Sequence, residues 1–276
     1  MIFIATLISL LIERFFHWGH LRQWRWFSIY QNKLNTKIGQ LNPAIRLAIY
    51  VLPFVLVVGI ISRVLTGWSY DIFHLVFATI VLLYCLGPGN LWAQAYQCLN
   101  ELNKDDPRHA PEFAQTAFEI PLPENSQAFH QALLRVLFVA ANQRIFAVIF
   151  WFAILGPMGA VLYRMVELCG SSSTSTVTDF AIKTKKILDW LPVRIFTFIF
   201  ALTGHFSKVF ARWKSGIQQG IDANDLVLVE CGTAALDVVK DNRVPEDGSA
   251  EKEALLLFDR TLVLALVILA VIVLLV

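Results

Sequence analysis

The feature that most constrains this chain is a set of apolar runs almost free of charge, each close to membrane-spanning length. A helix needs about 20 apolar residues to cross a hydrocarbon core of about 30 Å. Lipid cannot satisfy backbone polar groups, and the runs lack the alternation of a barrel strand. We therefore predict an all-α integral membrane protein with about four transmembrane helices. The spans are expected near residues 45–62, 72–88, 145–163 and 261–276.

The composition agrees with a membrane location. Hydrophobic residues make up 57% of the 276 residues. Charged residues make up 16%, where soluble chains average about 25%. The net charge of +2 does not provide the concentrated basic surface that nucleic acid requires, so nucleic acid is excluded as a partner. The lipid bilayer is the expected partner, and residues 1–276 are treated as a single membrane-embedded helical domain with helical connections at 89–144 and 164–260.

Three further segments are read as interfacial, re-entrant or buried helices. The apolar stretches 1–16 and 193–206 are too short or too charged to assign as spans, and a buried or re-entrant helix is an alternative for each. The segment 21–38 interleaves Trp, Phe and Tyr rings with Arg and Lys. That pattern is typical of a helix at the membrane surface, with its cations directed toward anionic lipid.

The distribution of Lys and Arg predicts the orientation of the chain. Residues 1–43 hold five basic residues, whereas the connection 63–71 holds only Arg63. Because basic residues favour the cytoplasmic side, we expect the N-terminal flank and the connection 89–144 in the cytoplasm and 63–71 outside. Residues 164–260 hold twelve of the 23 basic residues, which conflicts with the outside location that four spans would give them.

The sequence Gly156-Pro157 within the third run leaves two alternatives open. Proline removes a backbone donor and interrupts the helical hydrogen bonds. A kinked but complete span is the favoured alternative, because Pro and Gly are common in transmembrane helices. A re-entrant hairpin would instead keep both long connections in the cytoplasm.

The long connections contain their own helices and turns. In the first, we expect a helix over Trp92–Asn103, a break at 105–107 and a turn at 121–123 before the helix that enters the third run. In the second, the Ser/Thr-rich stretch Ser171–Thr178 is expected to be a flexible linker.

The sequence contains no pattern that identifies an enzyme. The spacing of the four cysteines fits neither a zinc site nor a redox pair, so they are expected to be buried thiols. The six histidines form no metal-binding pair, and the chain has no Walker A loop and no GxGxxG motif. Accordingly, no catalytic residue, metal or cofactor is predicted.

Polar residues at the ends of the apolar runs are the candidate ligand site. Asp189 and Arg194 flank Pro192, which suits a helix start with Asp as the N-cap and a snorkelling Arg. The alternative is a ligand site, because an Arg beside a helix N-terminus suits phosphate or carboxylate. An anionic small molecule is therefore the expected ligand. The candidate residues are Asn142, Arg144, Asp189, Trp190, Arg194 and His205.

Several short segments of the sequence resemble the AmpE family of bacterial inner-membrane proteins. They are AANQRIFAVIFWFAILGPMGAVLYRM over Ala140–Met165, LDWLPVRI over Leu188–Ile195, ALTGH over Ala201–His205 and LIERFF over Leu11–Phe16. The resemblance implies a multi-pass inner-membrane regulatory protein linked to β-lactamase induction, with a protein partner in the membrane or the cytoplasm.

The same segments are similar to those of the CobD/CbiB synthases of cobalamin assembly. Where those synthases carry Ala-Glu-Asn followed by Asp, this chain has Ala141, Asn142, Gln143 and Arg144. Amide-bond formation needs carboxylates for metal binding or proton transfer, so their absence argues against synthase activity. We therefore expect a regulatory, ligand-binding protein on a CobD/CbiB-like scaffold, with a divergent membrane transferase as the alternative and a transporter as the third choice.

Overall fold

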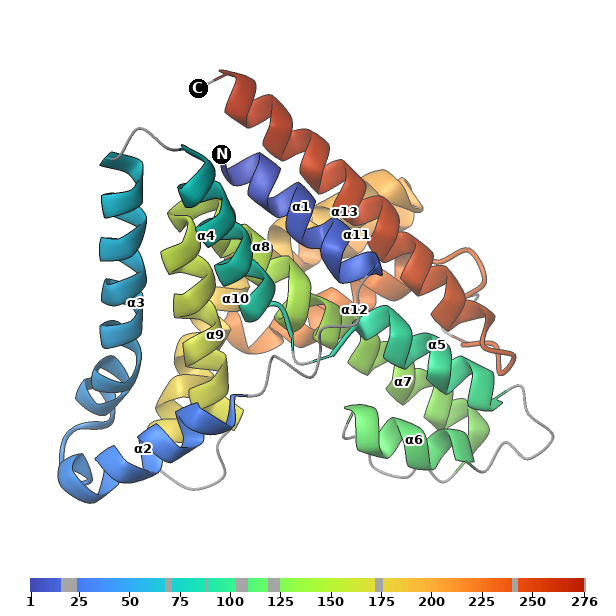
Figure 1. The fold of residues 1–276 in the computed structure, drawn as a ribbon. Coiled ribbons are helices and arrows are strands. Elements are labelled where there is room, and N and C mark those ends of the chain that lie inside the picture. The colour runs from blue at the N-terminus through green and yellow to red at the C-terminus, as the bar shows by residue number, and fades with distance from the viewer. Residues whose placement is uncertain are drawn as a thin grey trace. The chain divides into compact units, whose positions relative to one another are not determined.

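The computed structural model describes residues 1–15, 24–67, 71–87, 89–102, 109–118, 125–171, 176–239 and 243–275. These residues form helices and no β-strand, which confirms the prediction of an all-α protein (Figure 1). The breaks expected at 105–107 and 121–123, and residues 172–175 of the expected linker, lie outside the described residues. The linker prediction is wrong at the ends of the stretch, because Ser171 belongs to α9 and residues 176–178 begin α10.

The chain divides into two compact units. Unit 1 comprises residues 1–89 and 143–189, and unit 2 comprises residues 90–142 and 190–276. The single domain expected from the sequence stays a prediction.

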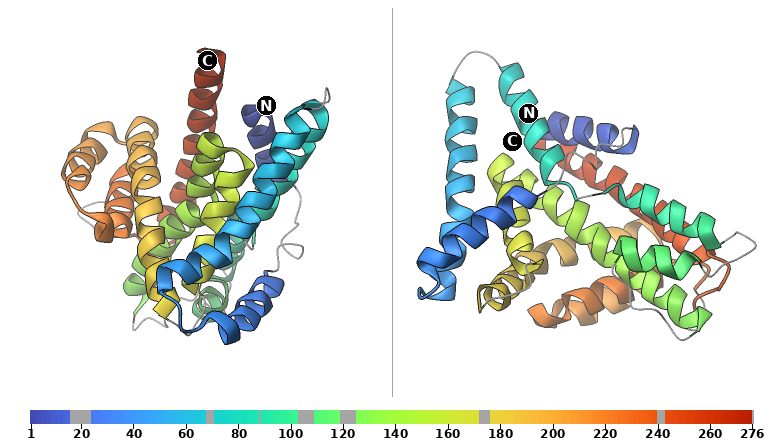
Figure 2. Two further views of the ribbon diagram at one scale, coloured as in Figure 1. Left: turned by 90° about the vertical axis from the view of Figure 1, so that its left-hand side faces the viewer. Right: turned by 60° about the horizontal axis from the view of Figure 1, so that its bottom comes forward.

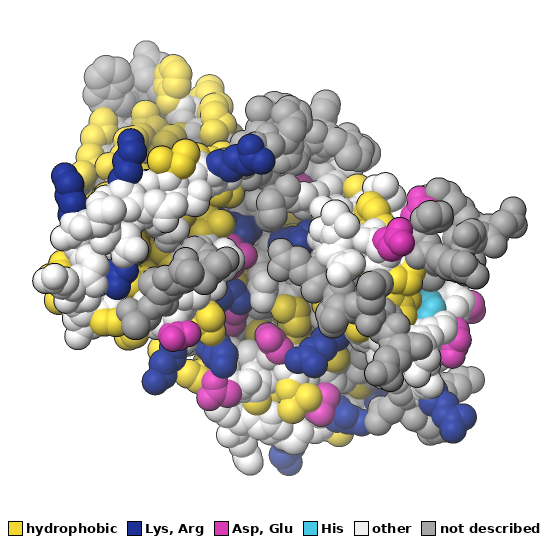
Figure 3. Space-filling model, turned by 90° about the horizontal axis from the view of Figure 1, so that it is seen from below, with side chains coloured by type: hydrophobic (Ala, Val, Ile, Leu, Met, Phe, Trp, Pro, Cys, Tyr) yellow, Lys and Arg dark blue, Asp and Glu magenta, His cyan; other side chains and the backbone are white. Residues whose placement is uncertain are grey.

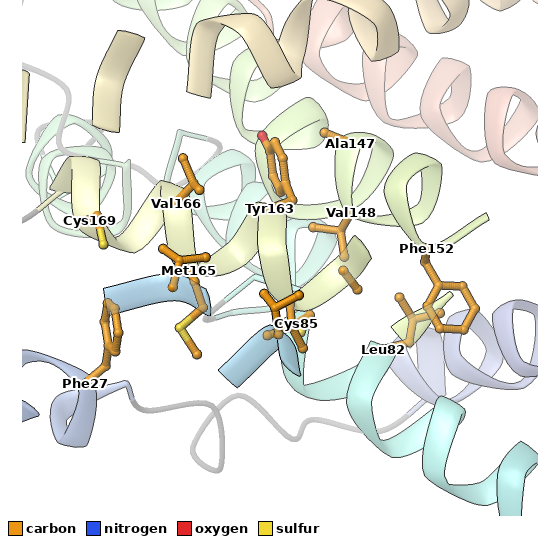
Figure 4. Packing of buried hydrophobic residues seen from close by; sticks show 14 of the residues in the cluster. Phe27, Leu82, Cys85, Ala147, Val148, Phe152, Tyr163, Met165, Val166 and Cys169 are labelled. Atoms are coloured by element: carbon orange, nitrogen blue, oxygen red, sulfur yellow. The ribbon is translucent and has the colours of Figure 1, made fainter. Parts of the chain in front are cut away.

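Unit 1 is built from six helices and the first part of a seventh. Its core lies around α9, which packs against α3, α4 and α8, while α1 packs against α4. Figure 4 shows part of this core, where Phe27, Met165 and Cys169 lie among buried apolar side chains. The helices are α1 (Ile2–Phe15), α2 (Arg25–Ile38), α3 (Pro43–Gly67), α4 (Asp71–Cys85), α8 (Ala147–Leu155), α9 (Pro157–Ser171) and the start of α10 (Thr176–Thr203).

Unit 2 contains the remaining helices and the end of α10. Its core includes the Phe138 ring, whose centroid lies 5.8 Å from that of Phe200 and 5.2 Å from that of Phe258. Gly232 permits this packing, because a Cβ there would lie 2.3 Å from a ring carbon of Phe138. The helices are α5 (Leu91–Leu102), α6 (His109–Phe118), α7 (Ser126–Ala141), α11 (Phe206–Ile217), α12 (Asn224–Ala235) and α13 (Ser249–Leu275).

Three described helical segments are long and apolar enough to cross a membrane, and α4 is a shorter apolar helix over Ile72–Cys85. The three segments are Pro43–Thr66, Ser126–Leu155 and Ser249–Leu275. Many large apolar side chains of α3 and α13 are exposed, as lipid-facing side chains would be. Arg63 lies inside α3 rather than in the connection that follows it, because the helix continues to Gly67.

The third apolar run is not one continuous helix. The chain folds back at Gly156, where α8 ends with a backbone φ of 65° that favours glycine, and Pro157 begins α9. A Cβ on Gly159 would lie 2.0 Å from the Trp151 carbonyl oxygen, although residues eight apart in one helix are separated by about 12 Å. The expectation of a kinked but complete helix over 145–163 is therefore wrong, and the fold-back alternative matches the geometry.

Helix α10 continues through Pro192, so the expectation that a helix starts at Asp189–Pro192 is also wrong. Proline has no N–H to donate to the carbonyl four residues earlier, which belongs to Leu188. The indole Nε1 of Trp151 donates to that oxygen at 3.1 Å instead. A side chain from α8 thus supplies the hydrogen bond that Pro192 cannot make, which explains why the helix is not interrupted.

Candidate functional site

The candidate residues Asn142 and Arg144 lie in a π-helical turn. Residues Asn142–Phe146 form this turn between α7 and α8. The Asn142 side chain is buried, and its backbone N–H donates to the carbonyls of Phe138 and Val139. Such turns are rare and occur often at functional sites, because the extra residue redirects the side chains around it. No sequence signal indicated this turn.

Within unit 1, Arg144 packs closely against the end of α4. The backbone N–H of Gly87 donates to the Arg144 carbonyl at 3.2 Å. A Cβ on Gly87 would lie 2.5 Å from Cγ of Arg144, so only glycine fits without a shift of that side chain. Gly87 therefore fixes where the aliphatic part of Arg144 lies, a role that is not evident from its sequence context.

Asp189 is a buried carboxylate in unit 1 that contacts Tyr163 and Lys185. The hydroxyl of Tyr163 donates to its Oδ1 at 2.7 Å, and Lys185 Nζ lies 3.0 Å from its Oδ2. Tyr163 comes from α9 and Lys185 from the preceding turn of α10. The ammonium group balances the charge of the carboxylate, so the three side chains form a neutral polar cluster.

Arg194 of unit 2 is a buried candidate residue whose guanidinium donates several hydrogen bonds. It is 5% exposed, and its guanidinium donates to Asn224 Oδ1, to the Gln219 carbonyl at 3.0 Å and to the Gly216 carbonyl at 3.3 Å. The Gly216 carbonyl belongs to the last turn of α11 and the Gln219 carbonyl follows its end, where a cation is favoured by the helix dipole. Its Nε is buried without a partner among the described atoms.

Two tryptophans surround Arg194. Its guanidinium carbon lies 5.0 Å from the ring centroid of Trp190, within range of a cation–π interaction. The indole of Trp213 donates to the Arg194 carbonyl at 2.8 Å. Burial lowers the pKa of Arg194 from its ordinary value, but a guanidinium remains charged at neutral pH. The Arg194 guanidinium is therefore a buried positive charge, and its described hydrogen bonds go to neutral oxygens.

His205 lies between α10 and α11. Its half-buried side chain forms an ion pair with Asp237 when the imidazole is protonated. Gly204 before it approaches Ala235 so closely that a Cβ would lie 2.7 Å from the Ala235 carbonyl oxygen. Helix α10 ends at Thr203, directly before Gly204 and His205.

The six candidate residues are divided between the two units. Arg144 and Asp189 belong to unit 1, whereas Asn142, Trp190, Arg194 and His205 belong to unit 2. Trp190 and Arg194 are in contact within their unit. The assembly of all six into one site, and the orienting role of Asp189 toward Arg194, stay predictions.

Sequence reasoning missed a second buried arginine. Arg164 in α9 is 1% exposed; its Nε donates to the Cys85 carbonyl at the end of α4 at 2.7 Å. Its Nη1 lies 2.5 Å from a carboxylate oxygen of Glu167. The Arg-x-x-Glu spacing is the available sequence signal, because residues three apart share one face of a helix.

A buried pair in unit 2 was also missed. His130 of α7 and Glu251 of α13 are both buried, with 2.7 Å between Nδ1 and Oε1. The pair joins the polar ends of two candidate spans. Nothing in the sequence predicted it, because the partners are 121 residues apart.

Among the residues that the structure describes, no group of three or more His, Cys, Asp or Glu side chains is placed to hold a metal ion. All four cysteines are free and buried, as expected from the sequence.

The apolar helices and their exposed apolar faces define an all-helical membrane protein. The family model described as "Regulatory signalling modulator protein AmpE" matches residues 1–276. The chain therefore belongs to the AmpE family.

Two curated relatives carry the name "Cobalamin biosynthesis protein CobD". The protein from Chromobacterium violaceum is 23% identical over 206 residues, which cover 72% of this chain and 64% of the relative. The protein from Stutzerimonas stutzeri is 25% identical over 201 residues, which cover 68% of this chain and 63% of the relative. The chain thus spans less than two thirds of the length of either relative. No solved structure matches it.

Proposed function

We propose that this chain is a multi-pass inner-membrane regulatory protein that takes part in β-lactamase induction and binds an anionic small molecule at Arg194. Membership of the AmpE family supports the regulatory role. The similarity to CobD proteins supports a shared scaffold. The observation that carries the ligand proposal is the buried guanidinium of Arg194, whose described hydrogen bonds go to neutral oxygens.

The first argument is the cost of burying a charge. Removing an ion from water is costly unless another charge or several good hydrogen bonds compensate. The carbonyls at the end of α11 compensate in part, because a helix C-terminus carries about half a negative charge. A carboxylate or phosphate supplies a full negative charge and can accept a hydrogen bond from Nε, which has no partner among the described atoms.

The second argument concerns access to the guanidinium. Trp190 covers one face of the group and is itself 36% exposed. An anion that displaces the Trp190 ring replaces a cation–π contact of Arg194 with an ionic contact, and this exchange favours its binding. A ligand that moves Trp190 also changes the surface of α10, which gives a regulatory protein a means to report binding to a partner.

A membrane transferase is the second candidate function. The observation that favours it is the Asp189 carboxylate, held between the Tyr163 hydroxyl and the Lys185 ammonium. A carboxylate between a proton donor and a cation is suited to proton transfer. Formation of an amide bond by a divergent transferase would require a second convergent carboxylate or a metal.

Complementation tests the proposal. In a bacterium that lacks the protein and carries an inducible β-lactamase, Arg194→Gln is expected to abolish the restored induction. Arg212→Gln is the matched control, because it removes the same charge from an exposed position on α11. Membrane abundance and thermal melting show whether each variant is folded.

Native mass spectrometry gives the binding proposal an independent readout. The wild-type protein released gently from membranes is expected to carry an anionic adduct that is absent from Arg194→Gln and present in Arg212→Gln. Full complementation by a folded Arg194→Gln variant would refute the assignment of the ligand site. If the Asp189→Asn variant loses its activity but still carries the anionic adduct at Arg194, the result would support the transferase instead.

A further inference from the structure

The outer face of α2 contains a surface hollow that the candidate site does not include. The hollow has a volume of 550 Å³. Five of the lining residues recur every three to four positions and share one exposed face of the helix, whereas Leu34 is half-buried against the core. The six lining residues are Ile29, Asn32, Lys33, Leu34, Thr36 and Lys37.

The opposite face of α2 is fixed to the rest of unit 1. Phe27 and Tyr30 pack against Phe54 of α3, and the Tyr30 hydroxyl donates to the Ile49 carbonyl at 3.2 Å. Gln31 donates to the sulfur of Cys169 in α9 at 3.2 Å. These contacts orient α2 so that the hollow faces outward.

Helix α2 lies at the end of a candidate span. It runs across the first turns of α3, as both views of Figure 2 show. Arg46 near the start of α3 donates to Asn35 of α2, and this bond holds the two helices together. Because the candidate span begins at Pro43, α2 is at the depth where hydrocarbon gives way to headgroups.

The stretch of chain that forms the hollow carries charge of one sign. From Arg14 to Tyr70 the sequence contains seven Lys and Arg residues, Arg14 included, and no Asp or Glu. Three of the cations, Arg25, Lys33 and Lys37, are exposed on α2 itself. In Figure 3, Lys and Arg side chains lie beside exposed hydrophobic ones over the part of this face that α2 forms. A ligand in the hollow therefore meets the positive charge of this stretch.

We propose that this hollow binds the headgroup of an anionic phospholipid. The Lys33 and Lys37 ammonium groups are one helical turn apart and bind the phosphate oxygens. The Asn32 amide donates to the polar part of the headgroup, and the Thr36 hydroxyl, which itself donates to the Lys33 carbonyl at 2.8 Å, accepts from it. Ile29, which is 56% exposed, packs against the first carbons of an acyl chain. The apolar residue at the edge of a basic site favours a lipid over a free phosphate ion.

The test measures lipid retention by the full-length protein. The protein is reconstituted in bilayers of equal parts phosphatidylglycerol and phosphatidylcholine, released, and analysed by native mass spectrometry. The wild type is expected to retain phosphatidylglycerol preferentially. The ratio of retained phosphatidylglycerol to phosphatidylcholine is expected to fall about fivefold in Lys33→Gln and about thirtyfold in Lys33→Gln/Lys37→Gln, because each cation that contacts the bound headgroup contributes about one factor of five.

Arg25→Gln is the matched control, because it removes an exposed cation of the same helix outside the hollow. It is expected to change the ratio less than twofold. All three variants change exposed side chains, and unaltered melting temperatures confirm that they fold. Equal retention of the two lipids by the wild type, or an equal loss in Arg25→Gln and Lys33→Gln, would overturn the proposal.

Discussion

Arg164 in unit 1 and Arg194 in unit 2 are both buried and donate to the carbonyl end of a helix, but they differ in how their charge is balanced. In unit 1, Arg164 binds the Cys85 carbonyl at the end of α4 and pairs with the carboxylate of Glu167. In unit 2, Arg194 binds the carbonyls of Gly216 in the last turn of α11 and of Gln219 after it. The remaining described contacts of its guanidinium are to Asn224, the Trp190 carbonyl and the Trp190 ring.

The difference separates a structural charge from one that is suited to binding. The Arg164–Glu167 pair is neutral as a whole, so a further anion gains little there. Arg194 keeps its net charge in a buried environment, so an anion gains the full interaction. Burial alone therefore does not identify a binding arginine; the identity of its partners does.

The largest expected effect comes from Arg164→Met. This change leaves the Glu167 carboxylate without its partner and the Cys85 carbonyl without its donor. Breaking a buried pair from one side costs about 3–5 kcal/mol of folding free energy. Chemical denaturation in detergent, or thermal melting of the purified protein, measures the loss.

The double variant Arg164→Met/Glu167→Met is the control for that prediction. Replacement of a whole buried pair by apolar side chains is often neutral, so most of the lost stability should return. If the double variant is as unstable as Arg164→Met, the pair is not the reason for the loss. The comparison of the two arginines would then fail.

A smaller effect is expected from Arg194→Lys. Lysine keeps the charge but lacks the planar fork with which Nη1 reaches Asn224 while Nη2 reaches the Gly216 and Gln219 carbonyls. The loss of one charge-assisted hydrogen bond costs about 1.5–3 kcal/mol. The variant should remain folded at growth temperature and yet fail to restore β-lactamase induction. Normal induction would mean that Arg194 only holds the end of α11.

The two tryptophans that donate to α10 sharpen the same comparison. Trp151→Phe leaves the Leu188 carbonyl without a donor, because Pro192 cannot supply one, and should cost about 1 kcal/mol. Trp213→Phe should cost less, because the Arg194 carbonyl also accepts from the Thr197 hydroxyl at 3.2 Å. Melting temperatures of the two variants provide the measurement. A larger loss of stability in Trp213→Phe than in Trp151→Phe would contradict the role of the Trp151 indole as the donor that replaces the N–H missing from Pro192.

The sequence predicted the parts of the fold that depend on local pattern. Apolar runs of spanning length predicted α3 and α13, and turn residues predicted that the connection after residue 89 contains more than one helix. The cysteines were correctly expected to be buried. These features follow from hydrophobicity and turn chemistry within a short stretch of chain.

The errors occurred where a distant side chain determines the local structure. Pro192 predicted a helix start, but the Trp151 indole, 41 positions earlier, satisfies the carbonyl that proline leaves open. Gly156 was expected to lie within a kinked helix, although its backbone conformation ends α8. In the candidate site, partners of Arg194 lie in the segment after α11 and in α12. The residues of α10 alone could not indicate these partners, because they are distant in the sequence.

The smallest expected effect concerns thiol chemistry, where the two units should behave alike. Burial raises the pKa of Cys169 in unit 1 and of Cys231 in unit 2 to about 12. Because only the thiolate reacts, about one thiol in ten thousand is reactive at pH 8, and the folded protein should resist maleimide labelling until it is denatured. The raised pKa also means that stability is unaffected below the ordinary thiol pKa and falls as pH rises above it. Rapid labelling of Cys231 but not Cys169 in the folded protein would show that unit 2 opens more readily. The buried charge of Arg194 would then be explained by access to solvent rather than by a ligand.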